Sequence, residues 1–156
     1  MKRDTLPTVL IVDDSPENLA VLNGLLQPGY RVLAATSGER ALRVAGGDPR
    51  PDLVLLEVRM PGLDGYQIFE RRRADPATRD IPVIFVTALD AREAELRGLE
   101  LGAVDYITKP IVPPVVLARV NTQLELKRAR DWPQDQNAIL EAAVARYLAE
   151  ERGEVA

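Results

Sequence analysis

The sequence predicts an α/β fold in which a doubly wound, five-stranded parallel sheet carries helices on both faces. Short apolar runs alternate with helical patterns from Thr8 to about Thr108. These runs do not alternate strictly between apolar and polar residues, which is typical of strands buried on both faces of a parallel sheet. A length of 156 residues allows one domain with its own core and a short appendage.

Five apolar runs are the predicted strands. They lie at residues 8–12, 30–34, 53–56, 81–86 and 103–107, and the last run is the weakest of the five. The first run stops at Asp13-Asp14, and the third follows Pro51-Asp52. Runs of this length fit strands better than helices, because helices rarely have fewer than eight residues.

Helices are predicted after each strand. The first begins at Ser15-Pro16-Glu17, a pattern typical of an N-cap, a proline at the first helical position and an acidic first turn. The second opens at Ser37 and ends before Gly46. The remaining three are expected at about 64–73, at about 90–101 and from about 113, where the fifth carries Val116, Leu117, Val120, Leu124 and Leu126.

An extra C-terminal helix is predicted beyond a break at Asp131-Trp132-Pro133. Its apolar stripe consists of Ile139, Leu140, Ala143, Val144, Tyr147 and Leu148. Because an isolated helix of this length is marginal in water, we expect it to dock on its own domain, on a second copy or on an output domain. The predicted division is a main domain at 1–130 and an acidic amphipathic appendage at 131–156.

The composition limits the possible chemistry. The chain has no cysteine and no histidine, so thiol catalysis, disulfides and histidine-based catalysis or metal binding are excluded. The net charge of −4 lies in residues 131–156, which hold two basic and six acidic side chains. We expect a cytoplasmic protein that contacts neither nucleic acid nor membrane directly, because no basic surface, spanning segment or signal peptide is evident.

Reactive side chains follow four of the five predicted strands. Asp13 and Asp14 follow the first, Glu57 the third, Thr87 the fourth and Lys109 the fifth. Ligands of open parallel sheets bind at this carboxyl edge. Clustered carboxylates suit Mg²⁺, and a hydroxyl and an ammonium opposite the ion would complete a receptacle for a phosphoryl group.

Four motifs carry a resemblance to a known family. They are VLIVDD at 9–14, PDLVLLEVRMPGLDG at 51–65, PVIFVTA at 82–88 and LGAVDYITKP at 101–110. Together they resemble the receiver domain of two-component response regulators over about residues 6–130. The resemblance implies a flavodoxin-like (βα)5 fold with strand order 2-1-3-4-5, acting as a signalling module and not as an enzyme.

The resemblance also implies roles for individual residues. Mg²⁺ would be held by Asp14, Glu57 and the backbone carbonyl of Arg59, with Asp13 assisting. Thr87 and Lys109 would contact the phosphoryl group, and Tyr106 would be the aromatic switch whose rotamer follows Thr87. The Lys109–Pro110 peptide would be cis. The implied partners are a sensor histidine kinase and either an output domain or a second copy, bound through the fourth helix, fifth strand, fifth helix and C-terminal helix.

One residue departs from the family pattern. The family has a phospho-accepting aspartate where this chain has Glu57. The extra methylene displaces the carboxylate, and a misplacement of about 1 Å can slow an in-line reaction on the order of a hundredfold. We therefore expect weak or absent phosphorylation at Glu57.

Two consequences of Glu57 compete. The longer carboxylate could draw in Thr87 and Lys109 as a partial phosphoryl mimic, or it could pair with Lys109 or the metal and lock the domain inactive. Mimicry is partial because a carboxylate carries one charge and a phosphoryl group nearly two. We favour a phosphorylation-independent receiver biased toward its active state.

Two further functions remain open. The segment Arg119–Arg130 resembles the last helix of receivers that lead into cyclic-dinucleotide output domains, so the chain could be the regulatory part of a cyclase or phosphodiesterase. A metal-free structural pseudo-receiver is the other alternative. The basic clusters Arg71–Arg73 and Lys127–Arg130 are interpreted as complements to helix dipoles.

Overall fold

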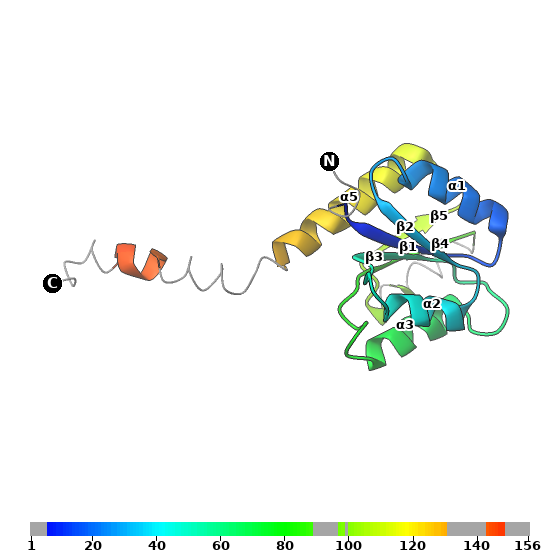
Figure 1. Ribbon diagram of the computed structural model, residues 1–156, viewed down its shortest axis with the longest axis horizontal. Coiled ribbons are helices and arrows are strands. Elements are labelled where there is room, and N and C mark those ends of the chain that lie inside the picture. Colours follow the sequence, from blue (N-terminus) through cyan, green and yellow to red (C-terminus); the bar gives the residue numbers. More distant parts are fainter. Residues whose placement is uncertain (1–5, 89–96, 99, 131–142, 149–156) are drawn as a thin grey trace. The chain divides into compact units, whose positions relative to one another are not determined.

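The computed structural model describes residues 6–88, 97–98, 100–130 and 143–148. The chain divides into two compact units, Met1–Leu124 and Glu125–Ala156, which are treated separately. The first unit is a layered α/β structure in which a central sheet has helices above and below it (Figure 1).

The sheet has five parallel strands in the order β2-β1-β3-β4-β5. They are β1 (Thr8–Val12), β2 (Arg31–Ala35), β3 (Leu53–Leu56), β4 (Val83–Thr87) and β5 (Asp105–Thr108). The predicted fold class and strand order are therefore confirmed. Every residue of β1, β3 and β4 is buried, which explains their uninterrupted apolar runs.

The sequence placed the limits of β2, β4 and β5 less accurately. β2 and β5 are edge strands with partly exposed residues, so their apolar signal is weaker. β4 begins at Val83 and not at residue 81. Pro82 has no N–H to donate, although its carbonyl accepts a hydrogen bond from the backbone N–H of Val54 at 3.0 Å.

Side chains cap the first three helices at their N-termini. The helices are α1 (Pro16–Leu26), α2 (Gly38–Ala45), α3 (Gly65–Ala74) and α5 (Pro113–Arg130). The side chains of Ser15 and Ser37 accept hydrogen bonds from N–H groups in the first turns of α1 and α2. Asp64 and Gln67 form a reciprocal capping box at α3.

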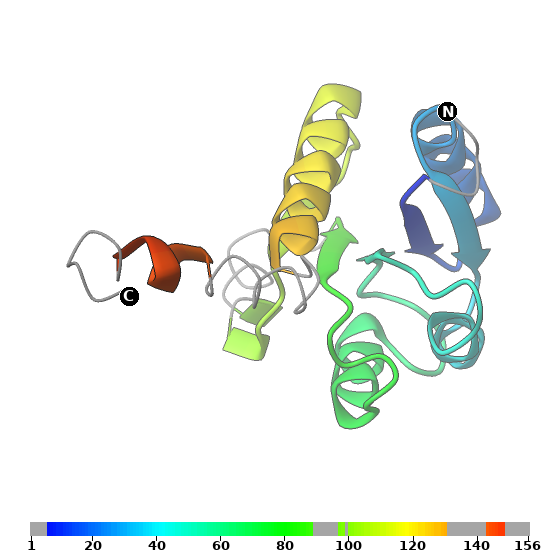
Figure 2. The ribbon, with the colours of Figure 1, turned by 60° about the vertical axis from the view of Figure 1, so that its left-hand side comes forward.

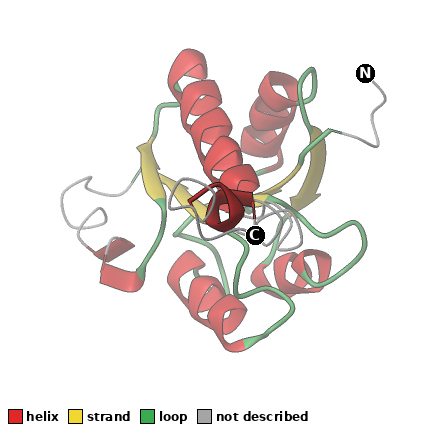
Figure 3. Ribbon diagram, turned by 90° about the vertical axis from the view of Figure 1, so that its left-hand side faces the viewer, coloured by secondary structure: helices red, strands yellow, loops and turns green. Residues whose placement is uncertain are grey.

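The sheet separates two hydrophobic clusters. Figures 2 and 3 show α1 and α5 on one face of the sheet and α2 and α3 on the other. The first face buries leucines of α1 and residues of α5, namely Leu19, Leu22, Leu26, Val116, Val120 and Leu124. The second face buries Ala41, Ala45, Ile68 and Phe69 against the sheet. The two clusters hold the sheet and its carboxyl edge in place.

Some predicted positions differ from the structure. Leu117 and Leu126 on α5 are exposed, because they lie off the face that carries Val116, Val120 and Leu124. Arg72, the middle residue of the basic cluster interpreted as a complement to the helix dipole, lies in the last turn of α3 but is buried, and its guanidinium carbon lies 4.4 Å from the centroid of the Phe69 ring. A methylene stem and a flat cation allow this residue to pack on an aromatic ring.

The C-terminal segment is described only in part. Residues 143–148 are helical, and Val144, Tyr147 and Leu148 are exposed. Ile139 and Leu140 lie outside the described residues, as does most of the predicted helix at 90–101, of which 97–98 and 100–101 are helical. In the described part of the chain, no helix has the length and apolar run needed to cross a membrane.

Candidate functional site

The predicted reactive residues gather at the carboxyl edge of the sheet. Asp13 follows β1, Glu57 follows β3, and Lys109 follows β5. The last residues of β1 and β3, Val12 and Leu56, are paired in register, so the side chains after them are neighbours. The sheet therefore brings together residues that are up to 96 positions apart in sequence.

Lys109 joins two buried carboxylates. Its Nζ donates to Oδ2 of Asp13 at 2.9 Å and to Oε1 of Glu57 at 3.1 Å. The three side chains are 16%, 4% and 10% exposed, in the order Lys109, Asp13 and Glu57. Shielding from water strengthens these contacts relative to a surface ion pair. Lys109 thus serves as the cation that two close carboxylates require.

Asp13 also accepts hydrogen bonds from the N-terminal end of α1, in addition to its contact with Lys109. Its Oδ1 accepts a hydrogen bond from the backbone N–H of Ser15 at 2.9 Å, and its Oδ2 accepts one from Nδ2 of Asn18 at 3.2 Å. Sequence reasoning missed Asn18. Its place in the first turn of α1, near the two aspartates, was the signal available.

Glu57 has both carboxylate oxygens engaged. Oε1 binds Lys109, and Oε2 accepts a hydrogen bond from the backbone N–H of Val58 at 2.9 Å. The backbone behind it is fixed by Gly65, where the Cβ of any other residue would lie 2.4 Å from the carbonyl oxygen of Glu57 and 2.8 Å from Cα of Val58. Only glycine fits there, so α3 begins directly against the backbone of Glu57.

The carboxylates perturb the titration of Lys109. Burial by itself lowers the pKa of Lys109, but the hydrogen bonds and charges of Asp13 and Glu57 outweigh burial and raise that pKa above its ordinary value. The ammonium therefore stays charged at neutral pH.

The other predicted site residues differ in their exposure. Asp14 and the Arg59 side chain are exposed, whereas Thr87 is fully buried. The carbonyl of Thr87 accepts a hydrogen bond from the backbone N–H of Lys109 at 3.0 Å. The hydroxyl oxygen of Tyr106 is buried, and its ring packs beside the core cluster that contains Phe85. The Lys109–Pro110 peptide is cis, as the resemblance implied.

The donor set suits a hard cation such as Mg²⁺, because Asp13, Asp14 and Glu57 offer only oxygen ligands. Mg²⁺ commonly takes one or two carboxylates and completes its shell with water. Among the described residues, however, no three acidic side chains lie close enough together to hold a metal ion by themselves. A bound ion would therefore depend on backbone and water oxygens as well.

The comparisons with known proteins agree with this geometry. The sequence profile of the response regulator receiver domain matches residues 9–121. The chain belongs to this family. Receivers are signalling modules and not enzymes, and they bind Mg²⁺ in their active site.

Two curated relatives extend beyond the receiver. The chain is 45% identical over 143 residues to a probable cyclic di-GMP phosphodiesterase of Vibrio cholerae, a match that covers 92% of this chain and 32% of the relative. It is 40% identical over 131 residues to the response regulator PleD of Caulobacter vibrioides, covering 83% of this chain and 29% of the relative. The chain thus spans about a third of the length of these relatives.

A solved receiver supports the family's link to magnesium. The receiver domain of a sensor histidine kinase from Pseudomonas aeruginosa, described with a magnesium ion coordinated in its active-site cleft, matches with a TM-score of 0.70. The two sequences are 31% identical, and the match covers 78% of this chain and 99% of the other.

Proposed function

We propose that this chain is the receiver module of a cytoplasmic response regulator that signals without phosphorylation of its own pocket. The observation that carries the proposal is the state of Glu57, which takes the place of the phospho-accepting aspartate. One oxygen of this carboxylate lies 3.1 Å from Nζ of Lys109, and the other accepts the Val58 N–H at 2.9 Å.

These contacts oppose phosphoryl transfer. An attacking carboxylate oxygen must lie in line with the leaving group, and the contacts with Lys109 and Val58 hold the two oxygens of Glu57 in a fixed orientation. The extra methylene adds a displacement, and in-line reactions tolerate displacement poorly. The same contacts hold Lys109 at the pocket, as a phosphoryl group would, so Glu57 acts as a partial mimic with one charge where a phosphoryl group has nearly two.

The proposed receiver binds one Mg²⁺ ion in its acidic pocket. Asp13, Asp14, Glu57 and the backbone carbonyl of Arg59 are its proposed ligands, and the ion would add positive charge to a pocket in which two buried carboxylates share the ammonium of Lys109. Thr87 and Lys109 form the side of the pocket that responds to Glu57, and Tyr106 is the proposed switch that follows Thr87.

A receiver of this kind needs partners. We propose an output domain or a second copy bound through the fourth helix, β5, α5 and the C-terminal helix, with a sensor histidine kinase as the family's usual upstream partner. The exposed Val144, Tyr147 and Leu148 fit a docking role for the C-terminal helix.

A second function, the regulatory part of a cyclic-dinucleotide enzyme, is favoured by one observation. The match to the Vibrio cholerae protein covers 143 of 156 residues, so it extends past residue 121 into the C-terminal segment. The full open reading frame separates the two candidates, because only the second requires a catalytic domain on the same chain.

A small-molecule phosphodonor tests the main proposal. The chain is incubated with acetyl phosphate and Mg²⁺, and its intact mass is measured beside that of Glu57→Asp. We expect one added phosphoryl group on Glu57→Asp and none on the native chain. Stable, Mg²⁺-dependent labelling of the native chain at Glu57 would refute the proposal. Calorimetric titration with millimolar Mg²⁺ separates it from the metal-free pseudo-receiver.

A further inference from the structure

A groove with two arginines lies next to the acidic pocket. It has a volume of about 520 Å³ and is lined by the loop after β3, by Tyr66 and by Arg97. Ligand sites of small molecules commonly have volumes of about 300–1,000 Å³. This Arg59–Arg97 groove, defined by residues 58–61, Asp64, Tyr66 and Arg97, has the size of a ligand site.

The walls of the groove differ in character. Tyr66 and Met60 are buried and form apolar surface, whereas Arg59 and Arg97 are exposed. The guanidinium carbon of Arg97 lies 4.4 Å from the centroid of the Tyr66 ring. This contact places the guanidinium of Arg97 over the Tyr66 ring, so a planar group in the groove can stack on the outer face of the guanidinium.

The described residues that line the groove carry two positive charges, on Arg59 and Arg97, and one negative charge, on Asp64. None of the ion pairs among the described residues involves Arg59 or Arg97. Among the described lining residues the acidic one is Asp64, whose Oδ1 also caps α3 by accepting the Gln67 N–H at 2.9 Å. Two guanidinium groups at one site are suited to the oxygens of a phosphate, which they bind through paired, charge-assisted hydrogen bonds.

We propose that the Arg59–Arg97 groove binds a phosphate-bearing small molecule of mononucleotide size, with its phosphate on the arginines and its planar base against the Arg97–Tyr66 wall. The groove shares Val58 with the acidic pocket, since the Val58 N–H holds Oε2 of Glu57. A ligand in the groove therefore reaches the backbone that positions Glu57. This link would give a receiver that does not accept phosphate a ligand-dependent input, and that part rests on the proposed function.

An NMR titration of the full ¹⁵N-labelled chain tests binding. The probes are adenosine monophosphate, adenosine, inorganic phosphate and a glutamate-rich peptide. We expect saturable shifts of the Val58, Arg59 and Tyr66 amides with adenosine monophosphate, and weaker binding of adenosine and of phosphate alone. Absence of saturable binding of the nucleotide at millimolar concentration, or binding of the acidic peptide alone, overturns the proposal.

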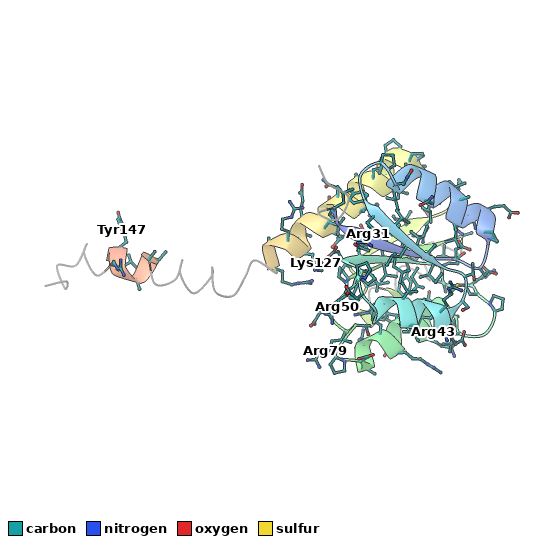
Figure 4. The ribbon with its side chains drawn as sticks, viewed as in Figure 1. Arg31, Arg43, Arg50, Arg79, Lys127 and Tyr147 are labelled. Atoms are coloured by element: carbon teal, nitrogen blue, oxygen red, sulfur yellow. The ribbon has the colours of Figure 1, made fainter. Side chains whose placement is uncertain are left out.

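Matched variants assign the binding to the groove. Arg59→Ala and Arg97→Ala should each weaken binding about tenfold, the effect of losing one hydrogen bond to a charged group. Arg43→Ala removes an exposed arginine of α2, labelled in Figure 4, that is not among the residues lining the groove, and it should bind as the native chain does. Arg97→Lys keeps the charge but not the stacking plane and should bind with intermediate affinity. Unchanged binding by Arg59→Ala and Arg97→Ala would overturn the assignment, whereas the phosphodonor experiment on Glu57 is independent of all these results.

Discussion

Replacing Lys109 by methionine should destabilise the domain by about 3 kcal/mol at neutral pH. The variant removes the ammonium between Asp13 and Glu57, whose side chains are only 4% and 10% exposed. Breaking a buried pair by removing one partner costs about 3–5 kcal/mol, because the remaining charge is buried without compensation. We take the lower end since Lys109 itself is 16% exposed and the carboxylates retain bonds to Ser15, Asn18 and Val58.

A double-mutant cycle attributes this loss to the network. Urea unfolding, followed by far-UV circular dichroism, gives the free energy of unfolding for the native chain, Lys109→Met, Glu57→Gln and the double variant. We expect a coupling energy of about 1.5–3 kcal/mol between the two sites, as for a hydrogen bond to a charged group. Arg40→Met, an exposed change on α2, is the control, with an expected effect within about 0.5 kcal/mol. A loss below about 1 kcal/mol for Lys109→Met, or additive effects in the cycle, would refute the reasoning.

Three further predictions concern stability. Gly65→Ala should lower the free energy of unfolding by about 2–3 kcal/mol in urea unfolding, because its methyl group would lie 2.4 Å from a backbone oxygen. Gly24→Ala is the control, since the space around Gly24 is open, and it should be neutral or stabilising by up to about 1 kcal/mol. Because folding raises the pKa of Lys109, the stabilisation from its positive charge is complete below the ordinary lysine pKa of about 10.4 and is lost as the pH rises through the higher native pKa. The free energies of unfolding of the native chain and Lys109→Met should therefore converge at alkaline pH. A difference between the two that stays constant with pH would contradict the assignment. Arg119→Ala removes the ion pair with Asp105, but this pair is 44% and 23% exposed, so a loss of no more than about 1 kcal/mol is expected in thermal unfolding.

The sequence was most informative where burial and topology decide the structure. β1, β3 and β4 are buried on both faces, so their apolar runs stand out, and the rule that ligands gather at the carboxyl edge placed Asp13, Glu57 and Lys109 in one site. The caps at Ser15 and Ser37 were also predictable, because a side chain that accepts a first-turn N–H follows local rules.

Three-dimensional contacts account for what the sequence did not predict. A Glu57–Lys109 pair was one of the two alternatives that the sequence left open, but the simultaneous contact of Lys109 with Asp13, and the support of Asp13 by Asn18, depend on rotamers and on the approach of separate strands. The burial of Arg72 against the Phe69 ring was not predicted, because a charged side chain is usually exposed. The Arg59–Arg97 groove joins the loop after β3 to a residue 38 positions later, and no local pattern marks that proximity.

The most direct test of phosphorylation-independent signalling is an NMR comparison of the pocket with and without phosphodonor. Amide signals of Thr87 and Tyr106 and the side-chain ammonium signal of Lys109 are recorded in Mg²⁺ buffer, before and after addition of acetyl phosphate, for the native chain and for Glu57→Asp. We predict that the native signals do not move when the donor is added and that those of Glu57→Asp do. Donor-dependent shifts of the native Thr87 and Lys109 signals, equal to those of Glu57→Asp, would contradict the account.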